Sequence, residues 1–211
     1  MPKQRITKES VVDAAFDIAR RYGMEQVMVK NIADNIGCSV QPIYSYCNSM
    51  EDLKRDVVER VDAFISEYVA ARIDKDDMFR STGKAYIQLA QDEPNLFKIF
   101  ILHKREGISS LKDLYRSEAN PQIAEYISKD LNISTEKAIE LHLNILIYTM
   151  GIGTIFSVTS PGISASEIYT HQELAYKAFL EQALENDDWH YTICNLAFTR
   201  GGAPCKQELS F

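Results

Sequence analysis

The chain has 211 residues, of which 45% are hydrophobic and 25% charged, the composition of an ordinary globular protein. Its four cysteines lie far apart along the sequence, which argues against a disulfide framework or a zinc knuckle and suits a reducing cytoplasm. The net charge is -7, but residues 1–60 hold nine basic and nine acidic residues, so the whole acidic excess lies beyond residue 60. A polyanion would therefore be repelled least at the amino-terminal end.

Helical periodicity dominates the sequence and no alternating strand pattern is convincing, so we expect an all-α fold. The first residues, MPKQRITKES, are basic but have no apolar core behind them, so no signal peptide is expected. Thr7 can cap a first helix, which Gly23 is placed to end. The residues on one face of this helix are Val11, Ala15, Ile18 and Tyr22.

Two helices follow that are too short to be stable alone. The first covers Val29–Ile36 and ends at Gly37, and the second, of about eight residues, is expected to be capped by Ser39 with Pro42 near its start. The residues that would hold both helices against the first one are Ile32, Ala33, Ile36, Ile43 and Cys47. A tight turn between two such helices predicts a helix-turn-helix, in which the start of the second short helix enters the major groove of DNA.

The exposed tip of the second short helix has side chains that suit this groove. Gln41 can pair bidentately with adenine, while Val40 and Pro42 can contact thymine methyl groups. The hydroxyl groups of Tyr44 and Tyr46, like that of Ser39, can bind phosphates, which fixes the register without reading the sequence.

A capping box at SMED starts a long helix from Ser49 to about Arg72. We therefore expect a helix-turn-helix domain at residues 1–48 and a larger helical bundle at residues 49–211, connected by the helix that runs from 49 to about 72. Further helices are expected from Pro94, from Pro121, around the apolar run 141–156, and over residues 164–186; the tail from Asp187 has no assignment. The apolar run is too short to cross a bilayer comfortably, so we expect no membrane partner.

The stretch IADNIGCSVQPIYSYCNSMEDL, after an amphipathic helix ending in RRYG, resembles the TetR-type transcriptional regulators over about residues 5–55. The positions that carry the resemblance are Ile32, Ala33, Gly37, Ser39, Ile43, Tyr44 and Leu53, with Tyr46 where a histidine is usual. Three positions differ from the family pattern. Cys47 replaces an aromatic residue, Met28 replaces a capping threonine or serine, and Met50 replaces a phosphate-binding lysine, for which Lys54 is a partial substitute. Whether these three differences weaken DNA binding relative to the family pattern stays open.

The residues expected to contact DNA are Met28, Lys30, Ser39, Val40, Gln41, Pro42, Tyr44, Ser45, Tyr46, Lys54 and Arg5. Arg5 belongs to the basic start of the chain, together with Lys3 and Lys8. Two interpretations of that segment stay open: it contacts phosphates or the minor groove, or it is a solvated, frayed end.

A ligand pocket, apolar with a few polar groups, is the second expectation for the bundle. The candidate lining residues are Phe97, Phe100, Ile101, His103, Tyr115, Tyr126, His142, Asn144, Tyr148 and Met150. Each of them could instead belong to an ordinary core. The family resemblance favours the presence of a pocket without favouring these particular residues.

Two glycines inside the apolar helix, Gly151 and Gly153, suggest a close approach of another backbone. One interpretation is helix packing across a dimer, with Tyr169 and Tyr176 on the following helix; the other is packing within one chain. We favour the dimer because reading two half-sites requires two helix-turn-helix units.

The sequence therefore predicts a cytoplasmic, ligand-responsive regulator, a repressor that binds a palindromic DNA operator as a homodimer and responds to a small-molecule effector. No catalytic residues, metal ligands or cofactor are expected. The identity of the effector, the operator and the regulated genes stay open, as does repression against activation. The alternative is an all-α small-molecule-binding protein or enzyme with no role at DNA.

Overall fold

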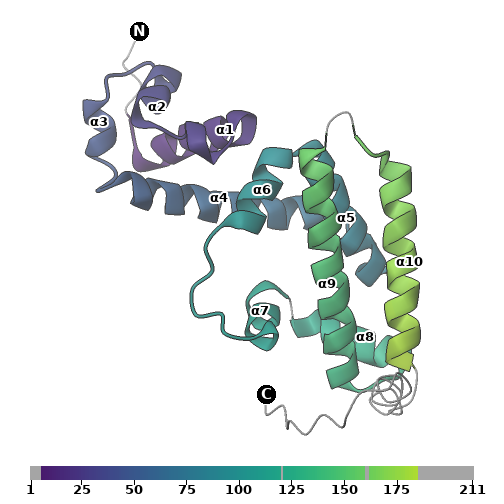
Figure 1. The fold of residues 1–211 in the computed structure, drawn as a ribbon. Helices are drawn as coiled ribbons and strands as arrows, with labels where there is room; N and C mark the ends of the chain where they lie inside the picture. The colour runs from purple at the N-terminus through teal and green to yellow at the C-terminus, as the bar shows by residue number, and fades with distance from the viewer. Residues whose placement is uncertain (1–5, 120, 160–161, 185–211) are drawn as a thin grey trace, which may run out of the picture.

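A computed structural model describes residues 6–119, 121–159 and 162–184. Within these ranges all regular structure is helical, which confirms the predicted all-α fold (Figure 1). The helices, in chain order, are α1 (Lys8–Tyr22), the 3-10 turn η1 (Met24–Gln26), α2 (Val29–Ile36), α3 (Gln41–Tyr44), α4 (Met50–Ala70), α5 (Met78–Asp92), α6 (Pro94–Leu102), α7 (Leu111–Glu118), α8 (Pro121–Leu131), α9 (Thr135–Val158) and α10 (Ala165–Leu184). The tail from Asp187 lies outside the described residues.

Helix α1 begins and ends where its sequence predicts. Thr7 Oγ1 accepts the backbone N–H of Ser10 at 3.2 Å, and Ser10 Oγ accepts that of Thr7 at 2.9 Å, so the cap is reciprocal. Gly23 ends the helix with φ at 94°, a conformation that disfavours any side chain. The predicted apolar face is buried except for Tyr22, which is 63% exposed. That part of the prediction was wrong because Tyr22 is the last residue of the helix, beyond the edge of the core.

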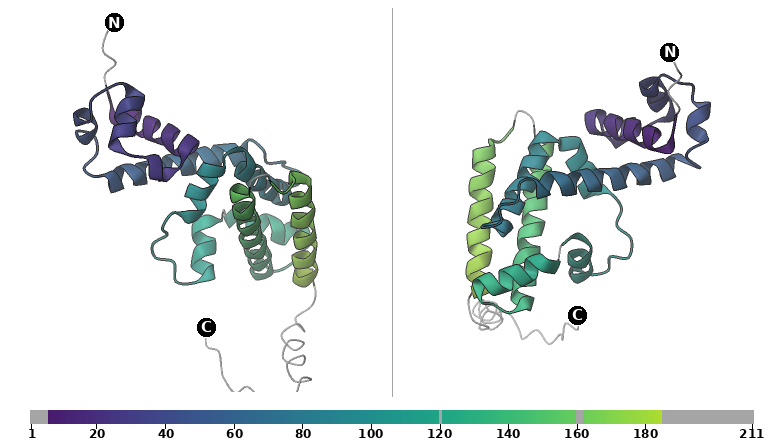
Figure 2. Two further views of the ribbon diagram at one scale, coloured as in Figure 1. Left: turned by 45° about the horizontal axis from the view of Figure 1, so that its top comes forward. Right: turned by 180° about the vertical axis from the view of Figure 1, so that it is seen from behind.

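Helix α4 is the long connecting helix that the sequence predicts. Ser49 caps it by accepting the backbone N–H of Asp52 at 3.0 Å. Its buried residues recur every four positions: Leu53, Val57, Val61, Ile65 and Val69. The helix leaves α1–α3 at one end and enters the bundle at the other (Figure 2). One continuous core therefore surrounds α4, with α1–α3 on its amino-terminal half and α5 and α6 further along.

Helix α1 is also joined directly to α6. Arg20 forms a two-bond ion pair with Glu93, with Nε 2.8 Å from Oε2, and Asn95 Nδ2 donates to the backbone oxygen of Arg20 at 3.1 Å. The amino-terminal helices thus contact the bundle at two places, through α4 and through this α1–α6 joint. The division of the chain at residue 48 stays a prediction.

Helix α9 is the central helix of the bundle and packs against α5, α6, α8 and α10. It is long and apolar enough to cross a membrane by length and composition alone, and 33% of its most apolar window is buried in this chain. A helix that packs against four neighbouring helices is a core helix of the bundle. Its outward face nevertheless exposes apolar residues, among them Ile147, Ile155 and Val158.

Candidate nucleic-acid interface and ligand cavity

A tight turn separates α2 from α3. Gly37 adopts the left-handed conformation (φ 76°, ψ 37°), and the backbone N–H groups of Gly37 and Cys38 both donate to the oxygen of Ala33 at 2.9 Å. Ile32 and Ile43, one on each side of the turn, are fully buried. The two short helices are therefore fixed against the core at a defined angle, as the sequence predicts for a helix-turn-helix.

Helix α3 is shorter than predicted and begins later. It covers only Gln41–Tyr44, with Val40 rather than Ser39 at its cap position and no side-chain capping bond. A capping side chain accepts an N–H two or three residues further on, and three residues after Ser39 stands Pro42, which has none. After Tyr44 the chain continues in tight i→i+3 turns, such as Tyr46 N–H to Ile43 oxygen at 3.0 Å. The predicted serine cap was wrong because Pro42 has no N–H to donate. The predicted length of about eight residues was wrong because the chain after Tyr44 continues in i→i+3 turns.

The tip of α3 points away from the protein, at the far end of the molecule from the bundle (Figure 1). Val40 is 44% exposed and Tyr44 61% exposed, and Ser39, Gln41 and Ser45 are exposed as well. Ile43, in the middle of the same turn, is 0% exposed and anchors it. The structure therefore presents the predicted groove-reading side chains together, on a support that is held in the core.

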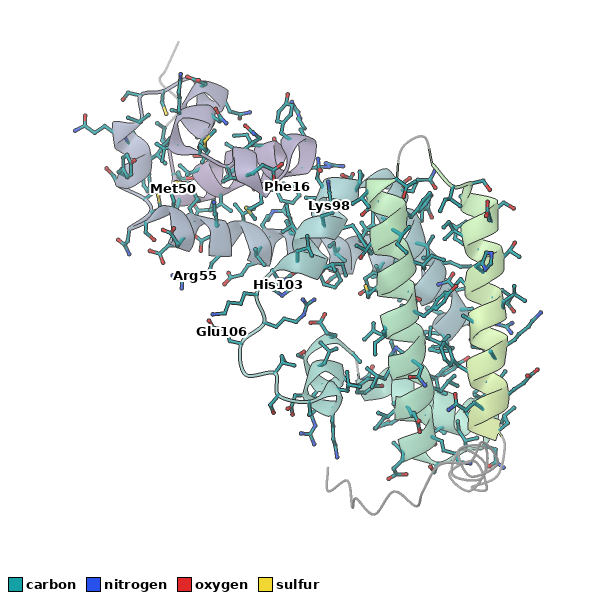
Figure 3. All side chains as sticks on the ribbon, viewed as in Figure 1. Phe16, Met50, Arg55, Lys98, His103 and Glu106 are labelled. Carbon is teal, nitrogen blue, oxygen red and sulfur yellow. The ribbon has the colours of Figure 1, made fainter. Side chains whose placement is uncertain are left out.

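The remaining predicted DNA-contacting residues surround this tip. Met28 precedes α2, is exposed, and makes no capping bond; Lys30 is exposed two residues later, and Lys54 is half-buried on α4. Met50 begins α4 and packs partly against the core (Figure 3). Arg5 lies outside the described residues.

Tyr46 has a role that the sequence did not suggest. Its hydroxyl donates to the backbone oxygen of Ile6 at 2.7 Å, which joins the turn after α3 to the chain start. The hydroxyl proton is thus already used, and only the oxygen is left to accept a bond.

Two adjoining cavities lie in the bundle. The inner cavity, about 190 Å³, lies between the end of α4 and helices α5, α8 and α9; its wall is mainly apolar, with His142 and Thr149 among its polar groups. The outer cavity, about 460 Å³, lies between α4, the end of α6 and the segment that leads into α7. Tyr86 and Glu118 belong to both walls, so the two cavities meet there.

Four of the predicted ligand-binding residues line these cavities. His142 and Met150 face the inner cavity, and Phe100 and His103 the outer one. The residues that line neither cavity are Phe97, Ile101, Tyr115, Tyr126, Asn144 and Tyr148. Among these, Tyr115 acts indirectly: its hydroxyl lies 2.9 Å from His142 Nδ1 and orients that ring.

His142 is a buried, neutral histidine. Burial lowers the pKa of its imidazole to about 4, so the ring is uncharged at pH 7. In the unfolded chain the imidazole of His142 has a pKa of about 6.5. Between pH 6.5 and pH 4 it is therefore protonated in the unfolded state and neutral in the folded state. Above pH 6.5 His142 is neutral in both states and costs no stability. As the pH falls below 6.5, protonation favours the unfolded state and the free energy of unfolding decreases.

We therefore expect His142 to lower the free energy of unfolding by about 2 kcal/mol between pH 7 and pH 5. The variant His142→Gln should lose that part of the pH dependence, whatever its stability at pH 7. Urea unfolding of both proteins at the two pH values measures the difference. Equal pH dependence in the two proteins would contradict a buried, neutral His142.

The four residues predicted for a dimer interface have different surroundings in the single chain. Gly153 is buried, and a Cβ atom there would lie 2.6 Å from Cζ of the fully buried Phe97, so intrachain packing against α6 explains this glycine. A Cβ atom at Gly151 would have no neighbour within 4 Å, and Gly151 is exposed. Tyr169 and Tyr176 are half-buried on α10, and Tyr176 packs against Phe79 with ring centroids 5.5 Å apart.

This difference between the two glycines predicts opposite effects of alanine. Gly153→Ala should lower the free energy of unfolding by about 1–3 kcal/mol through overpacking against Phe97, partly offset by better helix propensity. Gly151→Ala should keep or raise stability, by at most about 1 kcal/mol. Urea unfolding followed by circular dichroism tests both variants, and a Gly153→Ala protein as stable as Gly151→Ala would contradict the packing described here.

Comparison with known proteins agrees with this geometry. No protein-family model matches the chain. An uncharacterised helix-turn-helix-type transcriptional regulator of Mycobacterium tuberculosis is 28% identical over 99 residues, which make up 46% of this chain and 45% of that protein, so the match spans about half the length of this relative.

Solved structures match over most of the chain. A TetR-like transcriptional regulator from Rhodococcus sp. RHA1 superposes with a TM-score of 0.59 at 13% identity, over 84% of this chain and 98% of that one. The regulator BioQ, solved with its natural double-stranded DNA operator, superposes with a TM-score of 0.55 at 12% identity, over 84% and 99%. At such identities the likeness concerns the fold. The chain has the fold of the TetR-type transcriptional regulators, with its helix-turn-helix at the amino-terminal end.

Proposed function

We propose that this chain is a ligand-responsive transcriptional regulator that binds a palindromic DNA operator as a homodimer and represses transcription from it. The observation that carries the proposal is the exposed tip of α3, with Val40, Gln41 and Tyr44 in solvent above the fully buried Ile43. An exposed turn of helix on a rigid, buried support is what reading a major groove requires.

Base reading and phosphate binding fall to different residues. Gln41 would read an adenine, with Val40 and Pro42 against thymine methyl groups. Tyr44 and Ser45 would bind phosphates, together with Lys30 and Lys54 on the flanking helices. The described part of this interface offers few cations, so we expect a shallow dependence of operator affinity on salt.

A homodimer would explain the exposed apolar side chains of α9. Ile147, Gly151, Ile155 and Val158 recur at positions i, i+4, i+8 and i+11, which form one stripe along a helix, and all four are exposed. Helix α10 packs beside α9 and also exposes Leu174. A second copy of the chain packing on this pair of helices would cover the stripe.

The effector would bind in the two adjoining cavities. Both lie against α4, which carries Val69 of the inner wall, Asp62 of the outer wall and, near its start, Lys54 of the DNA-binding set. A ligand that binds more tightly to one orientation of α4 than to another would therefore change the distance between the helix-turn-helix domains of the two subunits. Its effect can be no larger than the difference in its affinity for the two states.

Selection of genomic DNA tests the proposed function on an operator of any sequence. The purified full chain is mixed with fragmented DNA of its own organism, and the fragments that it retains are sequenced. We expect a common inverted repeat with half-sites on the order of 34–36 Å apart, or a multiple of this distance. If the unchanged chain and its Gln41→Ala, Tyr44→Ala double variant both retain fragments that share no common sequence, the proposal is overturned.

A further inference from the structure

The outer cavity contains a carboxylate that lacks a counter-ion. Asp62 on α4 lines this cavity, and its Oδ1 atom is buried without a hydrogen-bond partner among the described residues. Burial raises the pKa of Asp62, and the nearby His103 and Arg105, which lower it, offset this effect only in part. A half-buried carboxylate with one fully buried, unpaired oxygen is costly, so a cation bound beside it would be stabilised.

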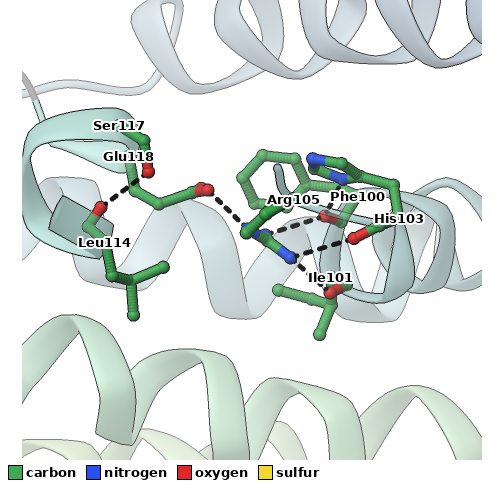
Figure 4. Close-up of polar contacts among 7 residues, drawn as sticks. All are labelled: Phe100, Ile101, His103, Arg105, Leu114, Ser117 and Glu118. Carbon is green, nitrogen blue, oxygen red and sulfur yellow. Dashed lines mark hydrogen bonds and ion pairs between the residues drawn. The ribbon is translucent and has the colours of Figure 1, made fainter. Parts of the chain in front are cut away.

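The cations of the same cavity are already engaged. Arg105 Nε donates to Glu118 at 2.6 Å, and its terminal nitrogens donate to the backbone oxygens of Phe100, Ile101 and His103 (Figure 4). The guanidinium therefore caps the carboxyl end of α6 and ties it to α7. With these bonds made, Arg105 has little left to offer an anionic ligand.

Lys104 and His103, the other basic residues of the outer cavity, also have partners. Lys104 pairs with Glu106 at 3.4 Å in solvent, and His103 Nδ1 donates to the backbone oxygen of Phe100 at 2.7 Å. Figure 3 places His103 and Glu106 on the segment that leaves α6. Among the wall residues, Glu106 and Glu118 thus have partners, and Asp62 is the carboxylate whose charge is not balanced by an ion pair within the described residues.

The neighbouring surfaces suit an apolar group attached to that cation. Tyr86 and Phe100 both line the outer cavity, with their rings stacked at a centroid distance of 6.0 Å and an angle of 18°. Tyr86 also belongs to the wall of the inner cavity, where Ile73, Leu146 and Met150 provide apolar contact. An aromatic face stabilises a nearby cation, and an apolar cavity accepts a hydrocarbon.

We propose that the effector is a lipophilic ammonium compound, with its hydrocarbon part in the inner cavity and its protonated amine in the outer cavity, beside Asp62 and the Tyr86 and Phe100 rings. This assignment rests on the proposed regulatory function and names the chemical class of its ligand. The ammonium N–H groups donate to the accessible side of the carboxylate, and its positive charge compensates the buried oxygen.

Calorimetric titration of the full chain with three probes of equal length tests the assignment. Octylamine is protonated at pH 7, 1-octanol is neutral and octanoate is negative. We expect octylamine to bind about tenfold or more tightly than 1-octanol, and octanoate to bind most weakly. Equal binding of octylamine and 1-octanol, or tighter binding of octanoate, would overturn the proposal.

Two variants of α4 separate the local carboxylate from overall charge. Asp62→Asn keeps the shape of the side chain and should weaken octylamine binding about tenfold or more, with no loss of thermal stability because an unpaired buried charge is removed. Glu59→Gln removes the same charge from an exposed position one turn earlier and should leave octylamine binding unchanged. An unchanged affinity in Asp62→Asn, or an equal loss in both variants, would contradict the assignment.

Operator binding distinguishes failure of this assignment from failure of the proposed function. If the chain selects an operator but octylamine neither binds nor changes operator affinity, the assigned ligand class is wrong and the regulator stands. If the chain binds octylamine but selects no DNA, the cavity binds amines without the proposed regulatory role, and the ligand is not an effector.

Discussion

The double variant Gln41→Ala, Tyr44→Ala is expected to lose at least about 100-fold in operator affinity, because each bidentate base contact contributes about 1–3 kcal/mol and a dimer makes it twice. Both side chains are exposed, so their removal should leave the core and the melting temperature unchanged. Fluorescence anisotropy with an operator fragment from the genomic selection measures the affinity. Binding to unrelated DNA should fall less, because it loses only the Tyr44 phosphate contact and not the base contact of Gln41.

A matched control exists in the same domain. Gln26 and Tyr22 are also an exposed glutamine and tyrosine, but they lie at the other end of α1 from the reading tip, around Gly23. The variant Gln26→Ala, Tyr22→Ala should bind the operator as the unchanged protein does. If the two double variants lose the same affinity, the tip of α3 has no special part in recognition.

The second large effect is expected from a charge in the apolar stripe of α9. Ile155 is 55% exposed in the single chain and would lie inside the proposed dimer. Ile155→Asp would place a carboxylate from each subunit in a dry interface, so dimer affinity should fall by at least about 100-fold. Operator affinity should fall with it, because two linked half-site contacts become independent ones.

Sedimentation equilibrium over a range of protein concentrations measures this change. Gln91→Asp adds the same charge at an exposed position on α5, outside the stripe, and should leave the dimer intact. A monomeric unchanged protein, or an Ile155→Asp protein that dimerises as strongly as the control, would contradict the assignment of this face.

Local sequence signals predicted most of the fold. Thr7 and Ser49 carry capping side chains, and Pro94 fits only the first turn of a helix, so the starts of α1, α4 and α6 could be read directly. Gly37 likewise fixed the end of α2, because the turn there needs a left-handed residue. Helix α3 was misjudged because two local signals conflicted: Ser39 favours a cap, and Pro42 lacks the N–H that the cap would bind.

The two cavities proposed for the effector were harder to predict because residues from distant parts of the chain form them. Asp62, Tyr86 and Glu118 come from α4, α5 and α7, and no spacing in the sequence relates them. The sequence pattern does not delimit α5 and α7, so Tyr86 and Glu118 were missed altogether. Apolar composition identified candidates such as Phe97, but whether a buried ring lines a cavity or packs on Gly153 depends on tertiary contacts.

The arrangement of α4 and α6 suggests how the proposed effector site would act on the proposed DNA-binding site. Helix α4 runs from the helix-turn-helix into the bundle (Figure 2). It carries Asp62 at the outer cavity and Lys54 near its start. Helix α6 carries Phe100 at the cavity, and Glu93, the residue before its first turn, pairs with Arg20 of α1. A ligand that displaces either helix would therefore move the reading unit, within the limit set by its differential affinity.

The most direct test of DNA reading by α3 changes the DNA and the protein together. Each adenine of a selected half-site is replaced in turn by 7-deazaadenine, which lacks the N7 acceptor of the major groove, and affinity is measured for the unchanged chain and for Gln41→Ala. At one adenine per half-site, the replacement should lower the DNA affinity of the unchanged chain about tenfold and leave the affinity of Gln41→Ala unchanged. If no adenine behaves in this way, and every replacement costs both proteins equally, Gln41 does not read the major groove.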